Sequence, residues 1–223
     1  MKKAYFITGT DTGVGKTWAT VALMRYFKQQ GRIVAGMKPV AAGCDWVDGQ
    51  LKNEDALLLQ ENASMDLDYK EINPYAFEMP VSPHLASLGD QVQLNVIEQA
   101  YTKLKDKADV LMVEGAGGWF APLNNDSDIA DLALKLKIPV IMIVAIRLGC
   151  INHARLTFQA IQSSGAECSG WIAMCLDPEM AKQDENIETL KSKISVPLLA
   201  VLPYMKEMDF DLLGTKINKK ILM

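Results

Sequence analysis

GTDTGVGKT, residues 9–17, directly follows an apolar run, Ala4–Ile7, near the start of the chain. Glycines let successive backbone N–H groups turn toward a phosphate, and a helix that begins at Lys16 adds the positive end of its dipole. Lys16 is placed to reach the β- and γ-phosphates of a nucleotide, and Thr17 offers a hydroxyl to magnesium. We therefore expect a phosphate-binding loop (P-loop) that binds ATP through Gly13, Val14, Gly15, Lys16 and Thr17.

The spacing of this loop departs from the standard motif. Five residues, not four, separate Gly9 from the Gly15-Lys16-Thr17 triplet. This favours a variant P-loop subclass over a generic ATPase. The alternative is a glycine-rich turn with a chance Gly-Lys-Thr, but that leaves the strand before it and the helix after it unexplained.

The composition is that of an ordinary globular chain. It has 223 residues, a net charge of −4 and four scattered cysteines, which predict neither a disulfide framework nor a zinc site. This length fits one large domain, residues 1–223. The negative charge argues against a nucleic-acid partner, and no apolar run is long enough to cross a membrane. Because the N-terminus lacks the apolar core of a signal peptide, we expect a cytoplasmic protein.

Apolar runs alternate with helical patterns along the chain. The expected strands are Tyr5–Thr8, Ile33–Pro39, Val110–Glu114, Val140–Ile146, Gly170–Cys175 and Leu198–Leu202. The expected helices are Lys16–Gln30, Asn53–Asn62, Asn95–Lys107, Ile129–Leu136, Asn152–Ser163 and Ala181–Ile194. The strands are apolar throughout, as in parallel strands covered on both faces. The pattern predicts an α/β fold with a doubly wound, mainly parallel sheet of the P-loop NTPase type, which binds ligands at the carboxyl ends of its strands.

Two segments lack a clear pattern. Met65–Pro83 is irregular and rich in proline, so we expect a long surface connection there. The tail from Lys206 is weakly patterned. For its end, Lys216–Met223, a docked terminal helix is favoured over an amphipathic membrane anchor.

Lys38 lies at the end of the second expected strand and opens the sequence KPVAAG, residues 38–43. Pro39 forces Lys38 into an extended conformation, and its position at the strand end brings its amine to the phosphate edge of the sheet. A lysine beside Lys16 suits a substrate that develops negative charge. The alternative is a solvated lysine at the end of a strand.

Two acidic positions are candidates for binding magnesium. Glu54 and Asp55 begin a helix, where acids commonly only complement the helix dipole, and the residues alone do not choose between them as ligands. Glu114 ends the apolar run from Val110, where packing gives no reason for a carboxylate. It fits the acid that binds magnesium, directly or through water, in P-loop enzymes.

Glycines follow Glu114 in the sequence GAGG, residues 115–118. They allow the backbone to approach a ligand closely. A plain turn after a strand would explain these glycines, but it would not explain Glu114.

RLGCINH, residues 147–153, follows the strand expected at Val140–Ile146 and opens a helix at the same sheet edge. Free N–H groups at that terminus can hold a carboxylate. Cys150 and His153 look like a nucleophile and a base, but no third orienting group is evident, so we expect an inert cysteine.

Four segments, in this order, resemble the dethiobiotin synthetase family of biotin synthesis: GTDTGVGKT at 9–17, KPVAAG at 38–43, VEGAGGWFAPL at 113–123 and RLGCINHA at 147–154. NEDALLLQ at 53–60, NPYAFEMPVSPH at 73–84 and GWIA at 170–173 extend the resemblance over nearly the whole chain. The first and third segments are shared in looser form with cobyrinic acid and cobyric acid amidases. The second and fourth segments together are specific to a much narrower group of proteins. The resemblance implies an ATP- and magnesium-dependent ligase that joins 7,8-diaminononanoate and carbon dioxide into a ureido ring.

The resemblance also implies roles for individual residues. A carbamate of the diamine would attack the γ-phosphate of ATP, and the resulting carbamoyl phosphate would close the ring. Lys16 would stabilise the transferring phosphate, while Thr12 and Lys38 would hold the carbamate. The resemblance settles the choice between Glu54 and Asp55, so that the implied magnesium ligands are Thr17, Asp55 and Glu114.

Family members are homodimers, which implies substrate sites shared between subunits. The implied substrate contacts are Ala42, Gly115, Ala116, Gly117, Gly118, Gly149, Cys150, Ile151 and Asn152. Of these, Gly149–Asn152 would bind the carboxylate of the diamine from the other subunit. Pro203 and Tyr204 would lie at the nucleotide.

Three positions depart from the family pattern. Ala42 stands where some relatives carry a serine that contacts the substrate, and Gly13 replaces an acid seen in one relative. Met174-Cys175 replaces an asparagine-containing pair that reads adenine. Because a methionine offers no hydrogen-bonding pair to a base, we expect weak selectivity among nucleotides.

Two other functions fit the P-loop less well. An amidase of the cobyrinic acid type would need a glutaminase domain, for which 223 residues leave no room. A switch ATPase of the ParA/MinD type, which acts through partner or membrane binding, carries an extra lysine early in the loop where this chain has Asp11.

Overall fold

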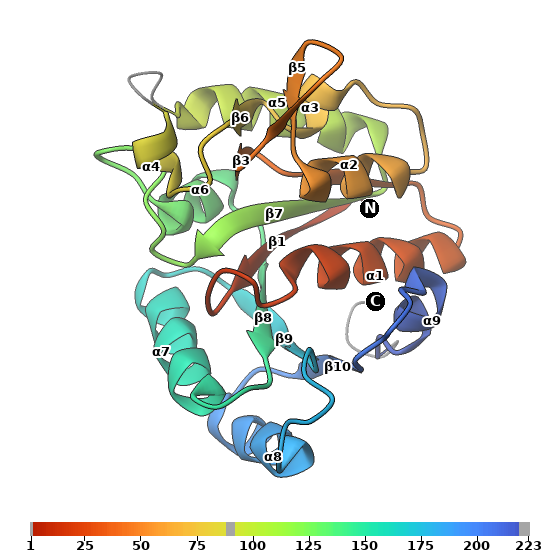
Figure 1. The fold of residues 1–223 in the computed structure, drawn as a ribbon, viewed down its shortest axis with the longest axis vertical. Helices are drawn as coiled ribbons and strands as arrows, with labels where there is room; N and C mark the ends of the chain where they lie inside the picture. Colours follow the sequence, from red (N-terminus) through yellow and green to blue (C-terminus); the bar gives the residue numbers. More distant parts are fainter. Residues whose placement is uncertain (1, 88–91, 219–223) are drawn as a thin grey trace.

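A six-stranded parallel sheet forms the centre of the computed structural model, which describes residues 2–87 and 92–218 (Figure 1). Its strands are β1 (Lys3–Gly9), β2 (Val34–Met37), β7 (Val110–Gly118), β8 (Val140–Ala145), β9 (Cys168–Met174) and β10 (Leu198–Leu202). They lie in the order β10-β9-β8-β1-β7-β2, and every neighbouring pair is parallel. The predicted parallel sheet is confirmed.

Helices cover both faces of this sheet. The connection from β1 to β2 runs across the sheet in one direction, and the connections from β7 through β8 and β9 to β10 run in the other. Right-handed crossovers therefore place their helices on opposite faces. One face carries α1 (Lys16–Gln29), α2 (Glu54–Glu61) and α9 (Phe210–Thr215), which pack against one another around α1 (Figure 1). The other carries α5 (Leu94–Lys107), α6 (Ile129–Leu136), α7 (Cys150–Ser163) and α8 (Gln183–Lys193).

The core follows from the apolar strands. Every residue of β2 and β8 is buried, as the absence of alternation predicted. The buried side chains of strands and helices form one continuous hydrophobic cluster. This core supports the carboxyl ends of the strands, the edge of the sheet where the functional side chains emerge.

Several element boundaries differ from expectation. β7 continues to Gly118, so residues 115–118 extend the strand beyond its expected end at Glu114, beside the P-loop. β2 ends at Met37, because Lys38 turns away and donates its N–H to Ile72 O. α7 begins at Cys150, two residues earlier than expected, with Gly149 as its N-cap.

The expected surface connection at Met65–Pro83 was wrong. It holds α3 (Tyr69–Ile72) and β6 (Tyr75–Phe77), and α4 (Pro83–Ala86) begins at its end. β6 pairs in parallel with β3 (Val40–Ala42), and Tyr69 and Ile72 are buried. Elements this short show no periodicity, so hydrophobic patterning alone cannot find them.

A small antiparallel hairpin, β4 (Asp45–Val47) and β5 (Gln50–Lys52), was also not anticipated. Its turn residues, Asp48 and Gly49, both have positive φ, as a tight hairpin turn requires. It projects at the top of the view in Figure 1.

The C-terminal tail contains α9, which was not anticipated, before the segment expected to be helical. Residues 216–218 of the expected Lys216–Met223 helix are not helical, and 219–223 lie outside the described residues. Ile217 is nevertheless buried. Within the described ranges, no helix is long and apolar enough to span a membrane.

Candidate active site

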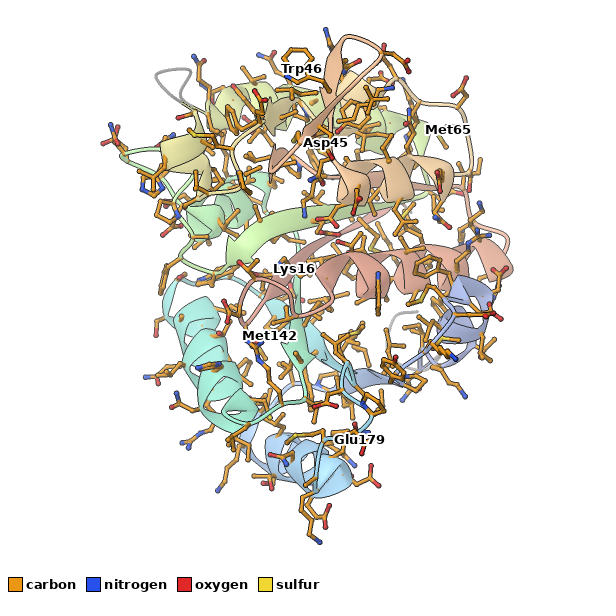
Figure 2. The ribbon with its side chains drawn as sticks, viewed as in Figure 1. Lys16, Asp45, Trp46, Met65, Met142 and Glu179 are labelled. Carbon is orange, nitrogen blue, oxygen red and sulfur yellow. The ribbon has the colours of Figure 1, made fainter. Side chains whose placement is uncertain are left out.

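A cleft of about 720 Å³ lies at the carboxyl ends of β1, β2 and β7. The P-loop and the start of α1 form its floor. The other walls come from the end of β7, the segment after β2, the start of α2, residues 80–83 and Leu176. Figure 2 shows Lys16, which belongs to the floor of the cleft, near the middle of the molecule.

The P-loop adopts the conformation that its glycines permit. Gly13 and Gly15 have φ of 69° and 85°, a region that side chains other than glycine rarely adopt. A Cβ on Gly15 would also lie 2.8 Å from Met174 Cε, so glycine is required there twice over. Val14 is fully buried between them and anchors the loop in the core.

Lys16 points into the cleft from the first turn of α1. Its Nζ donates to the carbonyl of Asp11 at 3.0 Å. Burial, and then the charge of Lys38, lower the pKa of Lys16 to about 8, against the opposing effect of Glu114, Asp55 and Asp11. An anion bound beside it would favour the protonated amine.

Lys38 forms the centre of a cluster of charges. Its Nζ lies 2.5 Å from Glu114 Oε1 and 2.7 Å from Asp55 Oδ2. Thr17 Oγ1 donates to the same Glu114 oxygen at 2.9 Å. The side chains of Lys38 and Glu114 are 6% and 0% exposed, whereas Asp55 is 42% exposed at the rim. The structure thus brings together Lys38 and the three expected magnesium ligands.

The cluster holds Lys38 and Asp55 in their charged forms. Burial alone would lower the pKa of Lys38, but Glu114 and Asp55 outweigh it and raise that pKa above its usual value. Burial alone would raise the pKa of Asp55, and the charge and hydrogen bond of Lys38 lower it instead. Lys38 therefore stays an ammonium and Asp55 a carboxylate.

A chain of hydrogen bonds fixes the backbone of Lys38. Asn73 Nδ2 donates to Lys38 O at 2.7 Å, and Tyr69 Oη donates to Asn73 Oδ1 at 2.9 Å. The same tyrosine oxygen accepts from the N–H of Asn53 at 2.7 Å. Asn53 caps α2 by accepting from Asp55 N. One buried network thus sets both Lys38 and the start of the helix that carries Asp55.

The oxygen atoms of this cluster fit magnesium. Glu114 Oε2 is buried without a hydrogen-bond partner, whereas Oε1 of the same carboxylate accepts from Thr17 and pairs with Lys38, which also pairs with Asp55. Such hard oxygen ligands suit magnesium, which commonly uses one or two carboxylates together with phosphate oxygens and water. Among the described residues no three His, Cys, Asp or Glu side chains form a metal cluster on their own. The donor set therefore fits an ion that arrives with a nucleotide.

The glycine-rich end of β7 forms one wall. Ala116, Gly117 and Gly118 line the cleft, and a Cβ on Gly117 would meet Ala121 Cβ at 2.9 Å. Gly115 does not line it, because it packs against Ile129 and Phe6 in the core. Thr12 and Ala42, both expected near substrate, line the cleft as well.

Eight expected site residues do not line the cleft of this chain: Val14 and Gly115, which are buried beside it, and six that lie elsewhere. Gly149–Asn152 form the start of α7, with Cys150 only 2% exposed. Pro203 and Tyr204 follow β10 at exposed positions. The burial of Cys150 agrees with an inert cysteine.

Sequence reasoning missed several cleft residues. Trp18 and Leu176 line one end, and residues 80–83 line the wall near Ala42. Only residues 80–83 left a signal, since they belong to the family-like stretch at 73–84. An ion pair between Asp11 and Arg147, 2.8 Å apart, also joins the P-loop to the segment before α7.

Comparison with known proteins decides the family. A family model described as an AAA domain matches residues 3–211. A protein of Aromatoleum aromaticum named ATP-dependent dethiobiotin synthetase is 44% identical over 209 residues, or 93% of each chain. A protein of the same name from Nitrosospira multiformis is 46% identical over 211 residues, 94% of this chain and 92% of that one. The chain belongs to the dethiobiotin synthetase family.

More distant solved structures share the fold. The cell-division protein MinD of Aquifex aeolicus, solved with MinC, has a TM-score of 0.59 at 15% identity over 96% of this chain and 86% of its own. The signal recognition particle receptor FtsY of Elizabethkingia anophelis has a TM-score of 0.54 at 15% identity over 97% of this chain and 65% of its own. At such identities the likeness is one of fold, and it confirms the P-loop NTPase architecture of this family member.

The burial of the Lys38–Glu114 pair predicts a stability effect. Lys38→Met leaves the Glu114 carboxylate buried without its cation, which we expect to lower the free energy of unfolding by about 3–5 kcal/mol. The double variant Lys38→Met/Glu114→Gln has no buried charge to compensate, so it should recover most of this loss. Urea unfolding of the three proteins at neutral pH measures the difference. A double variant that is no more stable than Lys38→Met would contradict the assignment.

Proposed function

We propose that this protein is an ATP- and magnesium-dependent ligase that forms dethiobiotin from 7,8-diaminononanoate and carbon dioxide. The observation that carries the proposal is the placement of Lys38, Asp55 and Glu114 in one cleft with the P-loop. The printed names of relatives that match over more than nine-tenths of the chain support it. Such a site positions a phosphate donor next to a second, negatively charged reactant.

Each polar group of the cleft has a role in this proposal. Lys16 binds the β- and γ-phosphates together with the backbone of the P-loop, and Thr12 and Lys38 hold the carbamate. Thr17, Asp55 and Glu114 hold magnesium. When bound, the ion neutralises phosphate charge and orients the γ-phosphoryl group.

The proposed reaction needs no nucleophile from the protein. One amine of the diamine adds to carbon dioxide and loses a proton, which gives a carbamate. A carbamate oxygen attacks the γ-phosphorus, and the bond to ADP breaks. The second amine then attacks the carbamoyl carbon, phosphate leaves and the ring closes. Lys38 opposes the negative charge of the carbamate, and Lys16 that of the transferring phosphoryl group.

A homodimer is part of the proposal. Gly149–Asn152 lie outside the cleft of their own chain, although the family resemblance assigns them to the substrate carboxylate. Large apolar side chains are exposed around this segment, with Leu148 93% and Leu156 58% exposed. A second copy of the chain would cover them and bring Gly149–Asn152 to its cleft.

The ligase activity predicts that nucleotide turnover depends on the diamine. Purified protein with ATP, magnesium and bicarbonate should release phosphate at a substantial rate only when 7,8-diaminononanoate is added. Mass spectrometry should then detect a product that carries the added carbonyl group. Turnover that ignores the diamine, or a product without the carbonyl, would refute the proposed reaction.

The shared site predicts complementation between two inactive proteins. Lys16→Ala removes a phosphate ligand, and Asn152→Asp places a negative charge where the carboxylate of the diamine is expected. A mixed dimer has one site with both defects and one with neither. Free exchange should therefore restore about a quarter of wild-type activity, because half of the dimers are mixed. Mass spectrometry should first demonstrate that the subunits exchange. If activity is still not recovered, Gly149–Asn152 belong to the site of their own chain or lie outside the chemistry.

A further inference from the structure

We propose that the base of the bound nucleotide packs against an apolar wall formed by Trp18 and Leu176, and that no side chain there reads the edge of the base. The site then accepts nucleoside triphosphates with different bases. This inference rests on the proposed function only in requiring that a nucleotide occupies the P-loop.

The order of the strands sets the direction of the nucleotide. Lys38, Asp55 and Glu114 come from β2, α2 and β7, which lie on one side of β1. Leu176 follows β9, on the other side of β1, and the P-loop lies between them. A triphosphate whose terminal phosphate reaches Lys38 must therefore extend its nucleoside toward Leu176. Trp18, in the first turn of α1, also lines the cleft.

Trp18 and Leu176 give that end of the cleft an apolar surface. Trp18 is the third residue of α1, lines the cleft and is 38% exposed. Leu176 Cδ2 lies 3.4 Å from the position that a Cβ on Gly15 would occupy, so the leucine borders the loop directly. Stacking on an aromatic side chain tolerates any base, because every base has a π-face.

The two residues at the end of β9, Met174 and Cys175, present no exposed side chain that could read a base edge. Met174 and Cys175 are 1% and 2% exposed, and Met174 packs beneath Gly15. Burial raises the pKa of the Cys175 thiol to about 11, so it remains a neutral, weak donor. Pro203 and Tyr204 do not line the cleft.

Backbone groups at this position are also engaged within the sheet. Met174 O accepts from Ile146 N at 2.8 Å, and Cys175 N donates to Leu202 O at 2.9 Å. The Cys175 N–H is therefore not free to donate to a base, and Met174 O has one of its two lone pairs already in use. Discrimination by one neutral hydrogen bond amounts to roughly two- to twelvefold, so its absence leaves little preference among bases.

Direct binding measurements test the inference without the ligase reaction. Isothermal titration with magnesium and the non-hydrolysable analogues of ATP, GTP and CTP gives three dissociation constants for the wild-type protein. The same titrations are made for Trp18→Ala, for Trp18→Phe, which keeps an aromatic face, and for Trp46→Ala. Trp46 is a matched control, because it is 63% exposed on the β4–β5 hairpin, far from Lys16 (Figure 2).

We expect the three wild-type dissociation constants to agree within about tenfold. Trp18→Ala should weaken all three analogues by a similar factor, on the order of tenfold, while Trp18→Phe and Trp46→Ala stay close to wild type. A preference above a hundredfold for ATP, or a Trp18→Ala effect that is absent or confined to one base, would overturn the inference. Binding of all three analogues without diamine-dependent turnover would refute the proposed ligase but support the apolar base wall.

Discussion

The ion pair between Lys38 and Glu114 is the constraint on which the site depends. A carboxylate with no exposed surface at the end of a buried strand is costly unless a cation meets it. Lys38, the residue that follows the neighbouring strand β2, supplies that cation. The pair lies at the sheet edge where ligands of this fold bind.

This arrangement links the lysine to the metal. The oxygens that suit magnesium are the same ones that Lys38 now neutralises, namely those of Asp55 and Glu114. A magnesium ion that binds there takes over part of this neutralisation, which leaves the Lys38 amine available to another anion. In the proposed reaction that anion is the carbamate.

The parts of the molecule that the sequence predicted well are those governed by long, repeated patterns. The six central strands and the long helices were foreseen because apolar runs buried on both faces differ plainly from helical periodicity. Lys38 and Glu114 were foreseen at the sheet edge because strand ends meet there. Asp55 was chosen over Glu54 only through the family resemblance, since helix-dipole effects treat the two acids alike.

Other features depend on contacts between segments distant in the chain. The Tyr69–Asn73 network that holds Lys38 lies in a stretch whose elements are too short to show a period. Gly115 was expected to approach a ligand and instead packs in the core. A glycine in a sequence indicates that another group comes close to the backbone, but it does not indicate whether that group is a ligand or a core side chain. The position of Trp18 in the cleft depends on how α1 is rotated about its own axis, and no local sequence motif predicts that rotation.

Magnesium binding by the charged cluster is the most direct test of this account. Isothermal titration of magnesium into protein saturated with a non-hydrolysable ATP analogue compares the wild type with Glu114→Gln. Glu54→Gln is the control, because Glu54 is an exposed acid in the same helix turn as Asp55. The account predicts that Glu114→Gln weakens magnesium binding by about tenfold or more, while Glu54→Gln leaves it unchanged. Magnesium affinity that is unchanged in Glu114→Gln would contradict it.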